Sequence, residues 1–278
     1  MTDHELIQCA QETPNHCSWL LAADGNAPEY HVRVALPDAV EPREGWPALF
    51  VLDGECLLGT FAEAIGRLSR RGDATGVIPA AIIAVAAVAQ PGIDHRKRDF
   101  ATPASQSAGD HAEADRFLRL IEGPMLASLL ARLPLDPDRI ALLGHSLAGY
   151  FVLHAIGSPS TPFSQFVALS PSIWWDAAHL RRRIERIEPA DRRAFLAVGE
   201  WEGALPPWQV GQPLAESALM RRRERQMIAN TQNMAQALVA RLGPHAVSMR
   251  LFDDEDHASM LTRSVAPALR FLTEGWRT

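Results

Sequence analysis

The chain has 278 residues, 47% of them hydrophobic, and carries a formal net charge of −6 at pH 7. This acidic balance argues against a nucleic-acid partner, which would require a basic face on the protein. No uninterrupted apolar run reaches the roughly 18 residues needed to span a bilayer, so we expect no membrane partner.

The three cysteines, Cys9, Cys17 and Cys56, show no paired spacing. This argues against a disulfide framework or a zinc site and favours a reducing compartment. The N-terminus also lacks the basic and apolar regions of a secretory signal. We therefore expect one cytoplasmic domain over 1–278, with residues 1–16 loosely ordered and with no metal or cofactor.

Strand-like and helix-like stretches alternate along most of the chain. The strand-like stretches are Trp19–Ala23, Tyr30–Leu36, Ala48–Leu52, Ala80–Val88, Arg139–Leu143, Gln165–Leu169, Ala194–Val198 and Ala246–Phe252. From the third strand onward, helical patterns lie at Cys56–Arg70, His111–Arg132, Leu147–Ile156, Ala177–Ile187, Leu219–Leu242 and Leu261–Leu272. This alternation predicts an α/β fold with a mostly parallel, doubly wound, eight-stranded sheet, whose first two strands pair antiparallel at one edge.

Two irregular segments, from Ala89 to about Gly109 and from Gly203 to about Ser217, are longer than the usual loops of such folds. Both follow the C-terminal ends of strands, where ligands bind in open α/β sheets, so we expect both to be functional. The stretch between Ser170 and Arg193 holds only one helix, which leaves no room for a large cap domain. An open cleft between two polar loops would suit a bulky, partly charged substrate.

The hexapeptide Gly144–Gly149, with the sequence GHSLAG, lies between an apolar strand and a helix-compatible run. A serine on such a turn, flanked by small residues, is typical of the nucleophile elbow of an α/β-hydrolase. Ser146 is therefore the candidate nucleophile, and the N–H of Leu147 would help to stabilise the oxyanion. The second oxyanion donor should follow the strand at 48–52, where Gly54 permits a tight turn and the N–H of Glu55 is our choice.

The other two members of a catalytic triad follow in the order that this fold requires, acid before base. His257 lies in a polar loop after the last strand, where the general base is expected. Glu202 lies three residues beyond the strand at 194–198 and its final glycine, and it is the preferred acid. Glu200 is the alternative acid, and a Ser-His dyad without an acid is also open.

Several motifs together give the chain a resemblance to a known family. They are Leu52–Glu55, the elbow Gly144–Gly149, Leu169–Asp176, Ile93–Pro103, Val198–Glu202 and Glu255–Ser259. With these motifs the chain resembles the esterase-D-type branch of the α/β-hydrolases, and more narrowly the bacterial ferric-siderophore esterases. The resemblance covers about residues 17–273. It departs from the family pattern at Ala148, where glycine is usual, and at Ala101, which appears as an insertion and leaves the register of Arg96 and Arg98 open.

The resemblance implies an ester substrate bound by charged and aromatic side chains. Arg96 is a candidate for binding an anionic catecholate or carboxylate, or for an ion pair with a carboxylate such as Asp99. Trp174 and Trp175 are candidates for stacking on aromatic rings of a substrate, or for packing the rim of the site, as are Trp201 and Trp208. The basic clusters at 181–183 and 221–223 are interpreted as solvated helix faces, with steering of an anionic substrate as the alternative.

Three functions are consistent with these residues. The first, implied by the resemblance, is hydrolysis of a ferric siderophore ester, which would release iron. The second is a general carboxylesterase or thioesterase that acts on small acyl or aromatic esters. The third is a catalytically silent relative, which is disfavoured because Ser146, His257 and a carboxylate are all present. Fold alone does not choose a substrate.

Overall fold

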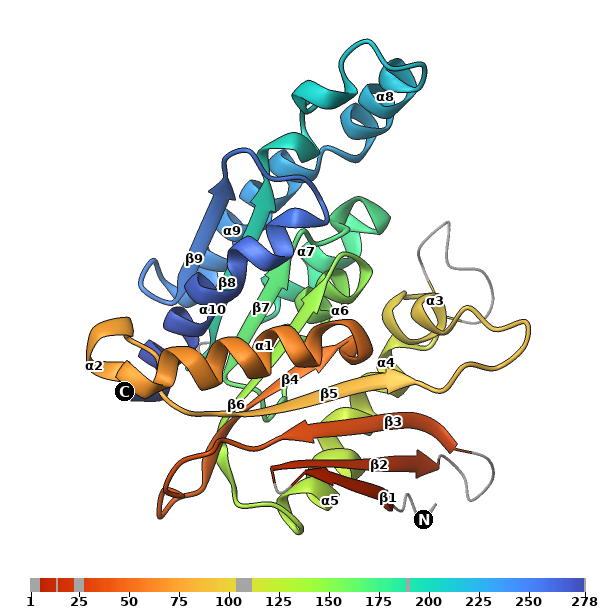
Figure 1. The fold of residues 1–278 in the computed structure, drawn as a ribbon. Coiled ribbons are helices and arrows are strands. Elements are labelled where there is room, and N and C mark those ends of the chain that lie inside the picture. Colours follow the sequence, from red (N-terminus) through yellow and green to blue (C-terminus); the bar gives the residue numbers. More distant parts are fainter. Residues whose placement is uncertain (1–5, 14, 23–27, 104–111, 189–190, 278) are drawn as a thin grey trace.

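A computed structural model describes residues 6–13, 15–22, 28–103, 112–188 and 191–277 (Figure 1). Residues 104–111, which belong to the first long irregular segment, lie outside the described residues. The described residues form one continuous sheet with helices on both faces. This continuity supports our proposal that the chain forms a single domain.

The sheet has nine strands in the order β1-β2-β3-β5-β4-β6-β7-β8-β9. The strands are β1 (Leu6–Thr13), β2 (His16–Ala22), β3 (Pro28–Ala35), β4 (Trp46–Leu52), β5 (Ala81–Ala87), β6 (Leu135–His145), β7 (Gln165–Leu169), β8 (Arg193–Gly199) and β9 (Val247–Phe252). The six strands from β5 to β9 in this order pair in parallel. The first three strands form an antiparallel edge, and β3 joins it to β5. The mostly parallel, doubly wound sheet with an antiparallel edge is confirmed.

All eight predicted strands are present, and β1 is an additional one. Within the segment 1–16, for which the sequence suggested loose order, Leu6–Thr13 forms a strand that pairs antiparallel with β2. Its apolar and polar residues do not alternate regularly, so the sequence does not mark it as a strand. Strand formation depends on the neighbouring strand more than on intrinsic preference, and β2 supplies the main-chain partners here.

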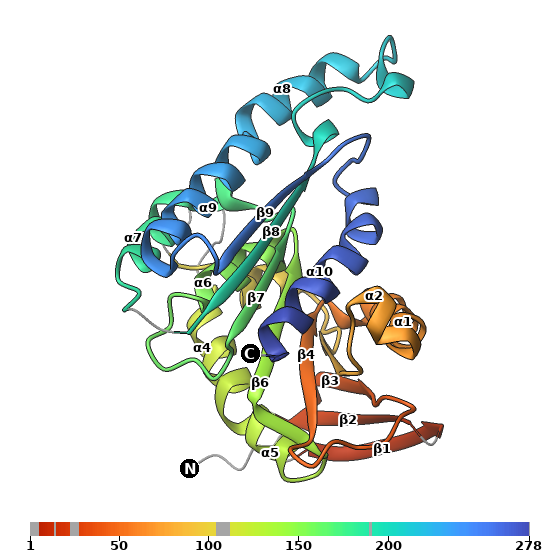
Figure 2. The ribbon, with the colours of Figure 1, turned by 90° about the vertical axis from the view of Figure 1, so that its left-hand side faces the viewer.

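Helices cover the two faces of the sheet as separate layers (Figure 2). They are α1 (Gly54–Leu68), α2 (Gly72–Thr75), α3 (His95–Phe100), α4 (Ala114–Leu120), α5 (Leu126–Leu130), α6 (Leu147–Ala155), α7 (Ala177–Glu185), α8 (Ala215–Arg225), α9 (Met227–Leu242) and α10 (Ser259–Arg277). One core lies between the sheet and α1 and α10, and the other lies between the sheet and α4, α6, α7 and α9. Each residue of β4 and β7 is buried because both faces of these strands are covered.

The helix predicted over 219–242 is two helices. It divides at Gln226, which adopts a left-handed conformation with φ 45° and ends α8 before α9 begins. None of the residues of α8 is buried, and the helix projects from the body of the protein as an arm (Figure 1). Because α8 packs no apolar face, its sequence merges with that of α9 and conceals the break.

The helix predicted over 111–132 is also interrupted. Residues Ile121–Met125 form a wider π-helical turn that contains Pro124. Proline cannot donate the regular helical hydrogen bond, and a π-turn accommodates that loss. No helix in the described part of the chain has both the length and the apolar character that crossing a membrane requires.

Candidate active site

The nucleophile elbow lies at the C-terminal end of β6. Ser146 lies between β6 and α6 with φ 60° and ψ −118°, a backbone conformation that residues other than glycine rarely adopt. The small flanking residues are required by close packing, since a Cβ atom on Gly144 would overlap the carbonyl oxygen of Ala148. Ala148 itself is fully buried at the position where the family pattern has glycine. The turn therefore holds the Ser146 hydroxyl at the edge of the sheet where the parallel strands end.

Ser146, His257 and Glu202 form a continuous chain of hydrogen bonds. The His257 Nε2 atom lies 3.0 Å from the Ser146 Oγ atom, and its Nδ1 atom lies 2.6 Å from Glu202 Oε2. A carboxylate only accepts, so Nδ1 carries the proton and Nε2 is free to accept the serine proton. The Glu202 side chain is 2% exposed, whereas that of His257 is 45% exposed and open to substrate.

Glu202 and Glu200 have different partners. The Ser170 hydroxyl and the Gly199 N–H both donate to Glu202 Oε1, which leaves Oε2 for His257. Glu200 instead accepts the N–H of Asp254 at 2.9 Å and so supports the loop that carries the histidine. Ser170 has a left-handed backbone, with φ 42°, and its role was not predicted. Its place in the Leu169–Asp176 motif was the available signal.

His145 supports the same loop from the other side. Its Nε2 atom lies 2.8 Å from the carbonyl oxygen of His257, and the two rings lie 4.7 Å apart. Burial and the neighbouring His257 lower the pKa of His145 to about 4. The ring is therefore neutral near pH 7, and its Nε2–H donates to the carbonyl group. This contact gives His145 a structural role beside the catalytic histidine.

The two residues named as oxyanion donors begin two different helices. Leu147 is the first residue of α6, and Glu55 is the second residue of α1. In the turn between β4 and α1, the residue with a left-handed backbone is Asp53, with φ 54°, rather than Gly54. Gly54 is needed for a different reason, since a Cβ atom there would lie 2.5 Å from the Cβ of Ala84 on β5.

A cavity of about 770 Å³ opens above Ser146 and His257. Trp174, Trp175 and Trp201 line it, as the sequence predicted for residues beside the site. Trp208 does not line it; its ring packs edge-on against Trp201 at 4.5 Å, and its side chain is largely exposed. The two long irregular segments both contribute residues to the walls, including Arg96 and Gln209.

Arg96 lines the cavity and also forms an ion pair. Its guanidinium contacts the Asp53 carboxylate, with Nη2 2.9 Å from Oδ2, rather than the expected Asp99. Arg98 is the residue that pairs with Asp99, with Nε 2.7 Å from Oδ1. Arg96 therefore faces the cavity and Arg98 faces the interior.

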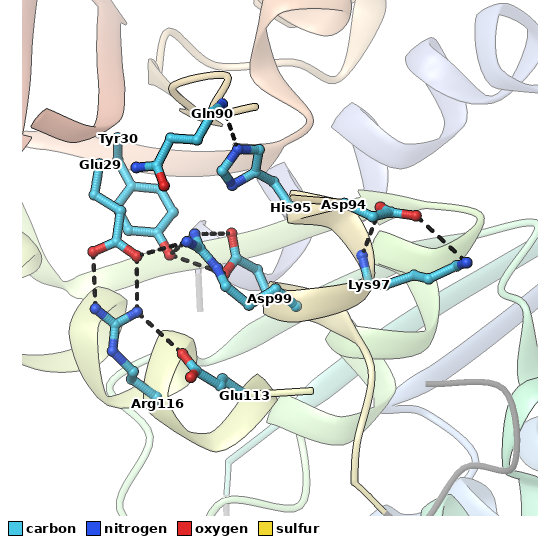
Figure 3. Close-up of polar contacts among 10 residues, drawn as sticks. Glu29, Tyr30, Gln90, Asp94, His95, Lys97, Asp99, Glu113 and Arg116 are labelled. Atoms are coloured by element: carbon cyan, nitrogen blue, oxygen red, sulfur yellow. Dashed lines mark hydrogen bonds and ion pairs between the residues drawn. The ribbon is translucent and has the colours of Figure 1, made fainter. Parts of the chain in front are cut away.

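Helix α3 is anchored by a buried ionic cluster (Figure 3). Arg98 contacts Glu29, Tyr30 and Asp99, and Arg116 makes two hydrogen bonds to Glu29. Burial raises the pKa of Asp99, and the hydrogen bonds and charge of Arg98 oppose this effect. Since α3 carries Arg96, the cluster holds one wall of the cavity in place.

We expect Arg98→Ala to lower the free energy of unfolding by about 3–5 kcal/mol, because it leaves the buried Asp99 carboxylate without a counter-charge. Arg96→Ala is the matched control on the same helix. Its ion pair is half-exposed, so its loss should cost less than about 1 kcal/mol. Urea denaturation of both variants measures the difference, and equal losses would contradict the anchoring role of Arg98.

The cluster at 221–223 lies on a helix without buried residues, as interpreted, but two of its members also face the cavity. Arg221 and Arg222 line the cavity, and Arg225 joins them, whereas Arg223 does not. The available signal was their place directly after the long segment that follows β8. Among the described residues, no group of three or more histidine, cysteine, aspartate or glutamate side chains could hold a metal ion.

Most of the chain matches a known protein family. Residues 27–241 match the model of the family described as Putative esterase. The chain belongs to this esterase family. With the nucleophile elbow and the doubly wound sheet, the esterase is a carboxylic ester hydrolase of the α/β-hydrolase fold.

Curated relatives share sequence with the esterase at a moderate level. It is 30% identical over 190 residues to the ferri-bacillibactin esterase BesA of Bacillus subtilis. The matched region covers 62% of this chain and 66% of BesA. It is 29% identical over 282 residues to the siderophore triacetylfusarinine C esterase of Aspergillus fumigatus, covering 95% of this chain and 94% of that one. The chain resembles siderophore esterases, as its motifs predicted.

Solved structures share the fold. The siderophore hydrolase EstB from Aspergillus nidulans superposes with a TM-score of 0.79 at 22% identity, covering 97% of this chain and 98% of that one. The BES protein from Bacillus cereus superposes with a TM-score of 0.74 at 23% identity, covering 97% and 99%. These likenesses confirm the α/β-hydrolase fold of the esterase.

Proposed function

We propose that the esterase hydrolyses ester bonds of a siderophore through an acyl-enzyme on Ser146. The observation that carries the proposal is the hydrogen-bond chain from Ser146 through His257 to Glu202, at the floor of a wide cavity. A serine hydroxyl is a weak nucleophile on its own, and an adjacent base that accepts its proton activates it. The 3.0 Å contact to His257 Nε2 has the length that such a transfer requires.

The reaction then proceeds in two steps. Ser146 Oγ attacks the ester carbonyl carbon, and His257 accepts its proton and passes it to the departing alcohol. Water, deprotonated by His257, attacks the resulting acyl-serine, which releases the acid and returns the proton to Ser146. Glu202 keeps the imidazole in the tautomer with the proton on Nδ1 and stabilises its cationic form in both steps.

The oxyanion of each step would accept hydrogen bonds from the backbone N–H groups of Leu147 and Glu55. Both groups lie in the first turns of helices, α6 and α1, where N–H groups have no partner within the helix. The positive ends of the two helix dipoles add to this stabilisation. The left-handed Asp53 turns the chain into α1 and so presents the second donor.

The dimensions and chemistry of the cavity favour a siderophore over a small acyl ester. Its volume of about 770 Å³ is near the upper end of small-molecule sites, and tryptophan rings and cationic side chains line it. The curated relatives are named for siderophore substrates. Hydrolysis of a chelator's ester linkages separates its metal-binding arms, so iron would be held less tightly after cleavage. The cytoplasmic location expected from the sequence remains a prediction, which cell fractionation tests.

The test uses ferric enterobactin and p-nitrophenyl butyrate, followed by mass spectrometry and absorbance, with Ser146→Ala as the blank. We expect ring opening of the ferric siderophore to have a higher kcat/KM than cleavage of the small ester. Rapid cleavage of p-nitrophenyl butyrate with the siderophore left intact would reject the siderophore substrate and retain a general esterase.

A further inference from the structure

Cationic side chains enter the cavity from two opposite elements. Arg96 and Lys97 come from α3, and Arg221, Arg222 and Arg225 come from α8. We call the last three the α8 arginines. The lining therefore holds five cationic and three acidic side chains. The α8 arginines derive from the projecting arm, which no step of the proposed hydrolysis uses.

The three acidic side chains of the lining are engaged by neighbours other than the α8 arginines. Glu202 is bound to His257, and Asp94 caps α3 and lies 3.6 Å from Lys97. Asp256 accepts the backbone N–H groups of the two residues that follow His257. Asp256 and Glu202 also attract Arg222 through space. The five cationic side chains nevertheless outnumber the three acidic ones in the lining.

The α8 arginines make no ion pair among the residues that the structure describes. Arg222 donates from Nη2 to the side chain of Gln209, while its Nη1 atom is buried without a hydrogen-bond partner in the described part of the chain. Arg225 lies over the ring of Trp174 at 4.7 Å. A buried guanidinium nitrogen without a hydrogen-bond partner is costly. Because Arg222 lines the cavity, a rotation of its side chain toward an anionic ligand would supply that partner.

We propose that the α8 arginines form an anion-selecting wall that makes the esterase prefer negatively charged metal complexes to neutral ones of the same size. The inference rests on the proposed siderophore substrate and specifies its chemical class. A ferric tris-catecholate complex is an anion, whereas a ferric tris-hydroxamate complex is neutral. Guanidinium groups donate charge-assisted hydrogen bonds to catecholate oxygens, and Trp174 adds a flat surface for an aromatic ring.

Binding is measured directly so that the result does not depend on turnover. In a Ser146→Ala background, quenching of tryptophan fluorescence gives the dissociation constants of ferric enterobactin and ferric triacetylfusarinine C. Both are cyclic triesters, and only the first is anionic. Replacing the three α8 arginines by glutamine should weaken ferric enterobactin binding by about 30-fold and the neutral complex by less than about 3-fold. Because no residue of α8 is buried, the variant should keep its fold.

Arg223→Gln is the matched control, since it removes one charge from the same helix outside the cavity. It should change neither dissociation constant by more than about 2-fold. Added KCl should weaken ferric enterobactin binding to the parent protein more steeply than to the triple variant. Equal losses for the two complexes, or a loss in Arg223→Gln as large as in the triple variant, would overturn the wall. Absence of siderophore hydrolysis by the unmodified enzyme would instead reject the proposed function, while the binding result would stand.

Discussion

Ser146→Ala is expected to lower kcat/KM for ester hydrolysis by about 10⁵-fold or more, with the fold retained. The hydroxyl is the only group at this turn that His257 Nε2 contacts as a partner for proton transfer in the described structure. The substitution removes one oxygen atom from a half-buried position. Alanine keeps the Cβ atom, so the backbone strain at φ 60° should stay the same. Initial rates with p-nitrophenyl butyrate and unchanged circular dichroism measure the effect.

Ser172→Ala is the matched control for that result. Its hydroxyl oxygen lies 3.4 Å from that of Ser146 and lines the same cavity, but no described contact joins it to His257. We expect a loss of less than about tenfold, which corresponds to one weak hydrogen bond. A larger loss in Ser172→Ala than in Ser146→Ala would mean that the nucleophile was misassigned.

Glu202→Gln should lower kcat by about 10³- to 10⁴-fold, because an uncharged amide neither stabilises the imidazolium nor fixes the tautomer of His257. The amide would also lie against the Ser170 hydroxyl and the Gly199 N–H, both of which donate hydrogen bonds to Glu202 Oε1. Since the amide is close in shape to the carboxylate, most of the loss should appear in kcat rather than in KM. Steady-state kinetics over a pH series measures both constants.

Glu200→Gln is the control that separates the two candidate acids. Glu200 accepts one backbone N–H, that of Asp254, and does not contact the imidazole. Its replacement should reduce kcat by less than about tenfold. If Glu200→Gln proved the more damaging change, the acid would be Glu200. If both variants kept most of their activity, a Ser-His dyad would suffice.

The sequence predicts most of this molecule because its central strands β4 and β7 are fully buried and its elbow has a strict steric requirement. Runs such as Ala48–Leu52 have no polar face, so they fit only the centre of a covered sheet. The choice of Ser146 follows from the elbow motif, and that of His257 from its place in the loop after the last strand. The choice between Glu202 and Glu200 depends on how a single turn of 3₁₀ helix at Glu200–Glu202 directs two side chains, which spacing only suggests.

The features that escaped prediction depend on contacts between distant segments. Arg96 and Arg98 are two residues apart, and the partners of Arg98 on β3, Glu29 and Tyr30, decide which one faces the interior. The break at Gln226 has no glycine or proline to mark it. The α8 arginines look like a solvated face because the sequence does not reveal that the helix stands beside the cavity.

The exposed arm formed by α8 allows the choice of substrate to change without a loss of fold stability. None of its residues is buried, yet four of them line the cavity. Substitutions on a helix that contributes no core contacts carry little thermodynamic penalty. A lineage could therefore change which esters it accepts by altering this one helix, while the hydrogen-bonded floor and the packed sheet beneath it stay constant. Diversity among relatives that share this fold should accordingly concentrate in α8.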